Sequence, residues 1–448
     1  QIEIRIRIIY IWMHMLRYIS KGMAALTTAL IIGGCSSTAQ TIMEPPLSEY
    51  HGLYTPSNTK EVQEAMHTNH PDYDWGLWGH NLVKVIKDEI KDEMYATING
   101  KRNSKQLCFS SNALYDVVRN YIIDQYGYGN DKYSERISIM PMDNKMACTC
   151  KKCKAKGNTE GNATPAVTAF VTKLAKEFPR HHFFTSAYHT TKQAPTTMLP
   201  ENVGVFVSSF PLPVQVDFSK SKGYKEFLAM VKAWKEKCQR IYVWDYERNF
   251  SDYLSPFPCL LAMQSRLQLY SQQGVLGVFF NGSGDDYSAF DDMQTHVLAL
   301  MMDDTDMNVH DAISNYFKEH YPITAPILTK YYWTLEQRTK KTNHELPLYG
   351  TMKNMCDAYL NVDEFVDFRR ELDAASKQTM GDERKRLNIL LTSLAYTQLE
   401  MYRCGLLTKD EEMADEMKEI LKGHSEIKGM KNRDEVGHTI DEYLKLWK

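Results

Sequence analysis

The stretch Arg240-Ile-Tyr-Val-Trp-Asp-Tyr246 decides the fold. It is short, apolar and rich in β-branched and aromatic residues, a composition typical of a buried strand. Similar runs recur along the chain, separated by longer amphipathic stretches. The other expected strands are Gly76–Gly79, Gln106–Ser110, Ile137–Met142, Phe183–Tyr188, Val203–Ser209 and Val275–Phe280.

The stretches between these strands have a helical period. They are Leu114–Tyr126, Ala166–Glu177, Tyr224–Lys237 and Leu260–Gln273. Alternating strands and helices predict parallel strands joined by helical crossovers, in a sheet that is either open and doubly wound or closed into a barrel. A doubly wound nucleotide fold needs a glycine-rich phosphate loop after its first strand, and the sequence has none. We therefore expect an α/β fold, a (β/α)8 TIM-type barrel over residues 71–305. Only seven strands are apparent, and the first strand is either hidden in residues 48–70 or missing from this chain.

Residues 306–448 predict a helical C-terminal region, because apolar residues there recur at helical spacing and no strand pattern appears. The expected helices are Val309–Glu319, Ile327–Lys340, Val362–Met380, Asp382–Cys404 and Asp410–Leu421.

The beginning of the chain has the pattern of an export signal. A basic segment that starts at Met15 precedes a short apolar run, Met23–Ile32, which is too short to span a bilayer. The run ends in Ile32-Gly-Gly-Cys35, which resembles a bacterial lipobox. We expect a signal peptide with lipobox over residues 1–35, lipidation at Cys35, a tether over residues 36–70, and export to the outer membrane, facing the cell surface or the periplasm.

The charge balance excludes one class of partner. The formal net charge is −3, so the chain has no global basic field to attract phosphates, and we expect no nucleic-acid binding. The chain holds 27 Tyr and 7 Trp, which fits either sugar stacking or a large core with tyrosine at its rim.

Acidic residues follow two of the expected strands. In a barrel the carboxyl ends of all strands meet at one face, where active sites lie. Hydrolysis of a glycosidic bond uses two carboxyl groups, or one carboxyl group and the acetamido oxygen of the substrate. We predict that Asp143 is catalytic together with an acid from the pair Asp245 and Glu247. The alternatives are a helix cap for Asp143 and rim ion pairs for the other two.

Other polar and aromatic side chains near the strand ends are expected to contact the substrate. They are Trp78, His80, Asn144, Tyr188, Trp244, Tyr246, Asn281 and Asp285.

The segment Cys148-Thr-Cys150-Lys-Lys-Cys153 is a weak candidate for a metal site. Three thiolates on one loop could hold Zn²⁺ with a fourth ligand such as a histidine. A disulfide is at least as consistent with an exported protein. We expect a structural role for this loop, with no catalytic metal and no cofactor.

Several of these segments together resemble a known family. They are Trp78-Gly-His80, Met140-Pro-Met-Asp143-Asn144 with the cysteine segment, and Val243-Trp-Asp-Tyr246. They resemble a family of Bacteroidetes exported proteins long labelled as a domain of unknown function, some of which belong to glycoside hydrolase family one hundred sixty-three. The resemblance covers about residues 70–305. It implies an endo-β-N-acetylglucosaminidase of complex N-glycans, with Asp143 at the family's acidic position and Trp244 and Tyr246 at its aromatic strand end.

The expected function is therefore a glycoside hydrolase, an endo-β-N-acetylglucosaminidase that acts on complex N-glycans or related glycans containing N-acetylglucosamine. Its catalysis would be acid/base, in a conventional or a substrate-assisted form. Two alternatives stay open. One is a non-catalytic glycan-binding surface lipoprotein. The other is an exo-glycosidase of the α-glucuronidase type, which calls for a basic residue such as Arg248 in the site.

Overall fold

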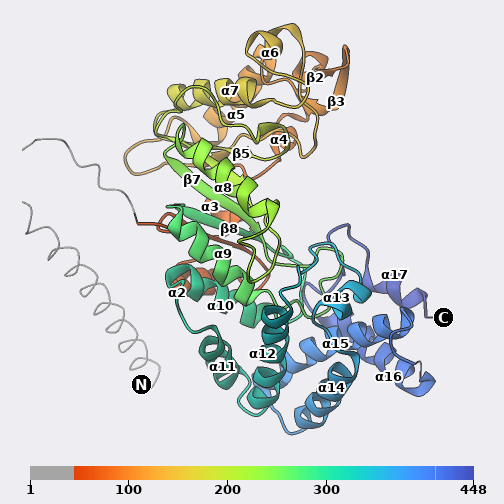
Figure 1. Ribbon diagram of the computed structural model, residues 1–448. Coiled ribbons are helices and arrows are strands. Elements are labelled where there is room, and N and C mark those ends of the chain that lie inside the picture. The colour runs from red at the N-terminus through yellow and green to blue at the C-terminus, as the bar shows by residue number, and fades with distance from the viewer. Residues whose placement is uncertain (1–44, 409, 448) are drawn as a thin grey trace, which may run out of the picture. The chain divides into compact units, whose positions relative to one another are not determined.

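Six parallel strands form the main sheet of the computed structural model, which describes residues 45–408 and 410–447 (Figure 1). Their order across the sheet is β1, β8, β7, β6, β5, β4. Their bounds are β1 Tyr50–Tyr54, β4 Arg136–Ser138, β5 His182–Ala187, β6 Val203–Ser208, β7 Arg240–Tyr246 and β8 Gly277–Asn281. Strands β4 to β8 confirm five of the sequence predictions, and β1 confirms that a strand is hidden in residues 48–70.

The sheet is strongly curled. The rings of Tyr50 on β1 and Phe206 on β6 lie 6.4 Å apart between centroids, although two strands separate β1 from β6. In a flat sheet three strand spacings would put these strands about 14 Å apart. The curled inner face therefore encloses an aromatic core. Its buried members are Tyr50, Trp75, Met140, Phe184, Phe206, Tyr242 and Phe279.

Both edges of the sheet continue by a single parallel bridge, from Gly52 to Asn69 and from Ile137 to Leu77. Both outer partners belong to the stretch 69–77, which thus connects one edge to the other. Only Leu77 of the expected strand Gly76–Gly79 pairs with the sheet. The described residues therefore form a six-stranded curled sheet, and a full ring of eight strands is not seen among them.

The expected parallel strand at Gln106–Ser110 is wrong. Residues up to Leu107 belong to β3 Lys101–Leu107, which pairs antiparallel with β2 Tyr95–Ile98 in a separate two-stranded sheet. The turn between them is Asn99-Gly100, and both residues have positive φ, 49° and 78°. An Asn-Gly pair of this conformation favours a tight hairpin, so the local turn overrides the parallel pattern.

The predicted tether also needs correction. The part of it that the structure describes contains β1 and helix α2 Lys60–Met66. Leu53 on β1 is buried in the core, so this segment is part of the folded domain. The described residues from Pro45 onward form one compact unit. The predicted leader with Cys35 lies outside the described residues.

Helices and short turns connect the strands along the chain. They are α3 Pro71–Asp74, α4 Leu82–Ile86, α5 Asn112–Tyr126, α6 Lys151–Ala155, α7 Thr164–Glu177, α8 Lys222–Lys235, α9 Leu260–Gln272 and α10 Asp291–Asp303, with short 3₁₀ turns at Asp92–Met94 and His189–Thr191. Helix α5 begins where the Ser111 side chain accepts a hydrogen bond from the Leu114 amide, and ends at Gly127 with φ 65°.

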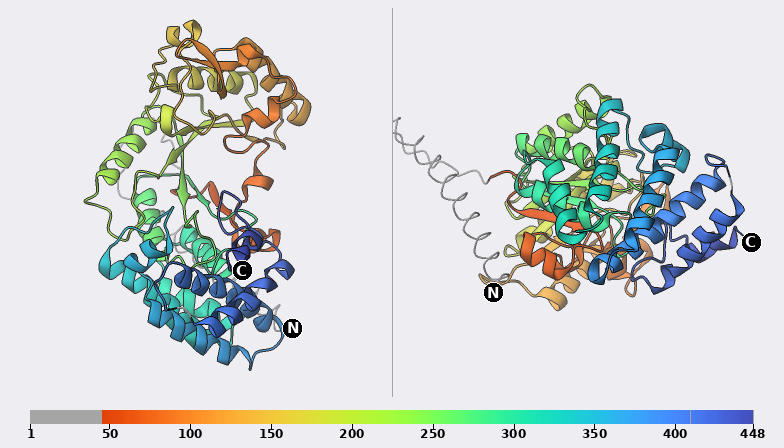
Figure 2. Two further views of the ribbon diagram at one scale, coloured as in Figure 1. Left: turned by 90° about the vertical axis from the view of Figure 1, so that its right-hand side faces the viewer. Right: turned by 90° about the horizontal axis from the view of Figure 1, so that it is seen from below.

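The predicted helical C-terminal region is present. Its helices are α11 Val309–His320, α12 Ala325–Thr342, α13 Met352–Ala358, α14 Val362–Ser376, α15 Gly381–Arg403, α16 Glu411–Lys422 and α17 Ile440–Lys445, with a 3₁₀ turn at Gly423–Glu426. The views in Figure 2 show the blue C-terminal helices gathered side by side, in keeping with the packing of α15 on α14 and α16. In the described part of the chain, none of the helices combines the length and apolar character that a bilayer span needs.

Candidate functional site

A group of aromatic side chains lies at the carboxyl end of the curled sheet. Trp244 on β7 stacks on Trp78, with ring centroids 5.0 Å apart and planes 15° from parallel. The ring of His80 lies 6.1 Å from that of Trp244 and 6.3 Å from that of Tyr188. Tyr246 follows two positions after Trp244, on the same face of β7. These five residues, the aromatic cluster, are all half-buried.

Asp143 lies beside this cluster. Its Oδ1 is 3.5 Å from Nε2 of His189, whose ring stacks on Tyr188 at 3.7 Å between centroids. Burial raises the pKa of Tyr188 to about 12, and the negative charge of Asp143 contributes in the same direction. The side chain of Asp143 is 61% exposed. The structure thus places this predicted residue next to the predicted aromatic wall.

A second carboxyl group at this place comes from the C-terminal region and is absent from the sequence prediction. The backbone amide of Glu435 donates to the Phe250 carbonyl over 3.0 Å, in the loop after β7. Burial raises the pKa of Glu435, a hydrogen bond from Tyr349 opposes that rise, and the charges of Asp434 and Asp143 add to it. The charges of Asp143 and Glu435 therefore interact at a distance, and Glu435, like Asp143, is exposed. No sequence signal marks Glu435, because it lies in an irregular segment far from any strand.

Asp245 faces the other side of the sheet from Trp244 and Tyr246. Its carboxylate is completely buried, forms an ion pair with Arg266 of α9, and accepts a hydrogen bond from the Tyr270 hydroxyl over 2.5 Å. Alternation along β7 causes this placement, since neighbouring residues of a strand point to opposite faces. The structure does not bring Asp245 to the aromatic cluster.

Glu247 directly follows β7 and is also buried. Its side chain is buried beside Gly282, where an added Cβ would collide with its Oε1. Arg248 Nη1 is 3.0 Å from Oε2, but neither carboxyl oxygen has a well-directed hydrogen-bond donor among the described residues. Burial raises the pKa of Glu247 to about 8, against the opposing charge of Arg248. No hydrogen bond among the described residues joins its side chain to the aromatic cluster, and its catalytic role stays a prediction.

Arg248 is not free to bind a uronic acid. Its guanidinium is buried, its Nη2 lies 3.0 Å from Asp291 Oδ1, and its Nη1 donates to Gln294. The α-glucuronidase alternative therefore loses the one basic residue named as its candidate, and stays otherwise untested.

Asn144 holds the loop of Asp143 instead of pointing to a ligand. Its Nδ2 donates to the Lys105 carbonyl over 2.7 Å, and its Oδ1 accepts from Gln106 and from the Met146 amide. Gln106 also bonds both the amide and the carbonyl of Met142. The end of β3 thus fixes the backbone on both sides of Asp143.

The two predicted residues at the end of β8 differ in position: Asn281 lies opposite Tyr246 of β7 on one side and Tyr54 of β1 on the other, whereas Asp285 lies toward β1. Asn281 ends β8 and is half-buried, and Asp285 is exposed. The charge of Asp285 contributes to the raised pKa of Tyr54, after burial and Asp72. The structure thus places Asp285 beside Tyr54 at the β1 edge, whereas Asp143 lies beside Tyr188 at the end of β5.

A separate hollow of about 350 Å³ lies next to Trp78. Its walls come from the stretch that connects the sheet edges and from α4 and α5: Pro71, Asp72, Trp75, Gly76, Leu77, Trp78, Asn81, Lys84, Val85 and Tyr121. Asp143 and Glu435 do not line it, so the hollow lacks the paired carboxyl groups.

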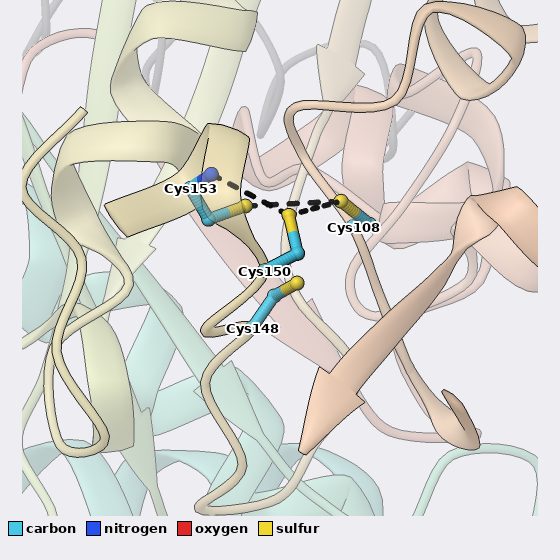
Figure 3. Close-up of side chains that lie close together, drawn as sticks. All are labelled: Cys108, Cys148, Cys150 and Cys153. Carbon is cyan, nitrogen blue, oxygen red and sulfur yellow. Dashed lines mark hydrogen bonds between the residues drawn. The ribbon is translucent and has the colours of Figure 1, made fainter. Parts of the chain in front are cut away.

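The three predicted thiols are joined by a fourth. Ligand atoms of Cys108, Cys148, Cys150 and Cys153, the four-cysteine cluster, all lie within 4.8 Å of one another (Figure 3). The fourth member is a cysteine that follows β3 and not the histidine suggested as a possible ligand. The sequence prediction misses it because it treats the hairpin that carries it as a barrel strand.

Comparison with known proteins identifies the family. Residues 37–333 match the family described as "Domain of unknown function (DUF4838)". The chain belongs to this family. No curated protein matches the chain. The narrower resemblance to glycoside hydrolase family one hundred sixty-three stays a prediction.

One solved structure with a similar chain path is described as a "GH138 enzyme targeting pectin rhamnogalacturonan II". The sequence identity is 8% and the TM-score 0.37, over 86% of this chain and 62% of that chain. The chain thus spans less than two thirds of that protein's length. At this level of similarity the match carries no argument about activity.

Proposed function

We propose that the protein is a glycoside hydrolase that cleaves glycans containing N-acetylglucosamine, such as complex N-glycans, by acid/base catalysis. The observation that supports this is that Asp143 and Glu435, two exposed acids from distant parts of the chain, are close enough for their charges to interact, near the aromatic cluster. Aromatic faces suit the apolar faces of sugar rings, and two carboxyl groups suit cleavage of the glycosidic bond.

The environments of the two carboxyl groups favour different roles. Glu435 is an exposed residue, but partial burial of its carboxyl group raises its pKa, a direction that suits a general acid that protonates the leaving oxygen. Asp143 is then the second carboxyl group. It would activate water, or orient the acetamido group of the substrate in the substrate-assisted form.

We also propose an exported, lipid-anchored location, on the basis of Ile32-Gly-Gly-Cys35. Incorporation of labelled fatty acid into the wild-type chain and not into Cys35→Ala tests it. Labelling that persists in the variant would rule out Cys35 as the lipid site.

We further interpret the two single bridges at Asn69 and Leu77 as shortened second and third strands of a (β/α)8 ring.

The activity test uses the purified protein and a panel of glycoproteins that carry complex N-glycans. Released oligosaccharide is measured for the wild type, Asp143→Asn, Glu435→Gln and the control Glu371→Gln, an exposed acid on α14. We expect the first two variants to lose activity by about 100-fold or more, the scale of acid/base catalysis, and the control to match the wild type. Equal activity in all four would remove both acids from the mechanism.

The exposure of Asp143 supports a second candidate, glycan binding without cleavage. In that case the wild type retains glycans through the aromatic cluster but releases no oligosaccharide from any substrate of the panel. Trp244→Ala would then weaken binding, and Asp143→Asn would change it little.

A further inference from the structure

We propose that the four-cysteine cluster is a structural zinc site, which fastens the β2–β3 hairpin to the loop that carries Asp143. The inference is independent of the proposed function, because it concerns a cluster that takes no part in the acid/base chemistry.

The spacing of the sulfur atoms fits a tetrahedral ion. Cys108 Sγ lies 3.7 Å from the Sγ atoms of both Cys150 and Cys153. A zinc–sulfur bond of about 2.3 Å in tetrahedral geometry puts two sulfurs about 3.8 Å apart. A disulfide would put them about 2.05 Å apart. The observed arrangement is therefore that of ligands around a shared centre (Figure 3).

The surroundings suit thiolate ligands. The Thr97 amide donates to Cys148 Sγ over 3.2 Å, and the Cys153 amide points to Cys150 Sγ over 3.5 Å. Three of the sulfur-bearing residues are buried.

The elements that meet at the cluster explain what the ion would do. Cys108 follows β3, and the other three cysteines belong to the loop before α6 and to α6 itself. Hydrogen bonds already join these two pieces, from Gln106 to Met142, from Asn144 to the Lys105 carbonyl and from the Thr149 amide to the Thr97 carbonyl over 2.9 Å, and the ion would add a fourth attachment at Cys108. Four thiolates leave no open position on zinc, so the ion is structural and not catalytic. It would stabilise the hairpin end whose Gln106 holds the backbone next to Asp143.

The test measures metal content, independently of glycan cleavage. The purified full chain is analysed for bound metals and by X-ray absorption at the zinc edge, together with Cys108→Ser and the control Cys404→Ser, an exposed cysteine at the end of α15. We expect one zinc per chain with four sulfurs at about 2.3 Å in the wild type and the control. In Cys108→Ser we expect zinc binding to weaken at least about 100-fold.

A second measurement avoids dependence on a variant that fails to fold. Cobalt added to the metal-stripped wild type gives intense visible bands if it occupies a tetrahedral thiolate site, and zinc abolishes these bands. Mass-spectrometric detection of disulfides among the four cysteines in metal-free native protein would overturn the proposal. So would wild-type metal content in Cys108→Ser, or nitrogen and oxygen ligands in the absorption spectrum.

Discussion

At the scale of single residues, Asp245 is a carboxyl group whose hydrogen-bonding capacity is used inside the protein. Ser209 Oγ donates to it over 2.6 Å, Tyr270 donates to its other oxygen, and Arg266 pairs with it in a site with no solvent exposure. We predict that Asp245→Asn destabilises the fold by about 3–5 kcal/mol, because it leaves a buried guanidinium without its counter-charge.

Denaturant unfolding measures this change, with Asp382→Asn as a control that breaks only an exposed pair with Lys385. The control should lie within about 1 kcal/mol of the wild type. If Asp245→Asn is as stable as the wild type but has lost activity, Asp245 has a catalytic and not a structural role.

Tyr349 adjusts the acidity of Glu435. Its hydrogen bond lowers the pKa of Glu435 while burial raises it. Removal of the hydroxyl in Tyr349→Phe should therefore raise that pKa further. If Glu435 is the general acid, activity falls as pH rises through its pKa, so the falling limb of the kcat/KM profile should move to higher pH in the variant.

The profile is measured for the wild type, Tyr349→Phe and Tyr73→Phe, an exposed tyrosine elsewhere. A limb that stays in place, or that moves to lower pH, would contradict the role of Glu435 as the acid.

At the scale of elements, the large aromatic side chains on the inner face of the curled sheet pack without collision because small residues lie opposite them. Gly204 on β6 leaves room for the ring of Phe184 on β5, and a Cβ at Gly204 would collide with that ring. We predict that Gly204→Ala destabilises the protein by about 1–3 kcal/mol through overpacking.

Thermal and denaturant unfolding check this, with Gly161→Ala as the matched control, since a Cβ there meets nothing within 4 Å. Equal stability of the two variants would mean that the inner face can adjust, and that glycine at 204 is not required.

The elements differ in how far the sequence can predict them. Strands β5 to β8 are predictable because each is a buried apolar run between helices. The hairpin β2–β3 is missed, since the Asn99-Gly100 turn falls in what the pattern presents as a link between barrel strands. The alternation along β7 already places Asp245 opposite Trp244, and the structure confirms that. Glu435 reaches the site only through contacts with Phe250 and Tyr349, which no local pattern contains.

At the scale of the whole molecule, buried acids tie the stability of the fold to pH. Burial raises the pKa of Glu247 to about 8, well above the value of an unfolded glutamate. The folded state therefore binds more protons than the unfolded state between about pH 4.5 and 8. Stability from this group is fully present below that range and is lost as pH rises through it.

We predict that Glu247→Gln removes this part of the pH dependence. Relative to the wild type, the variant should gain stability as pH rises from about 5 to 8, reaching about 2–4 kcal/mol at the upper end. Unfolding free energies measured across this range test it. Burial also raises the pKa values of Glu336 and Asp252 to about 7. Both residues titrate in the wild type and in the variant, so their contributions to the unfolding free energy cancel in the difference. A difference that does not change with pH would show that Glu247 is already charged in the folded protein.

The pairing of β1 with β8 has a consequence for how the chain is made. These strands are separated by about 220 residues, with Tyr50 opposite Gly277 and Tyr54 opposite Asn281. A ribosome adds about 5–20 residues per second, so the first strand is finished roughly 10 to 45 seconds before its neighbour exists. Throughout that interval the nascent segment 50–54 has an unsatisfied backbone edge, which makes it the place where a holding chaperone would protect the chain most.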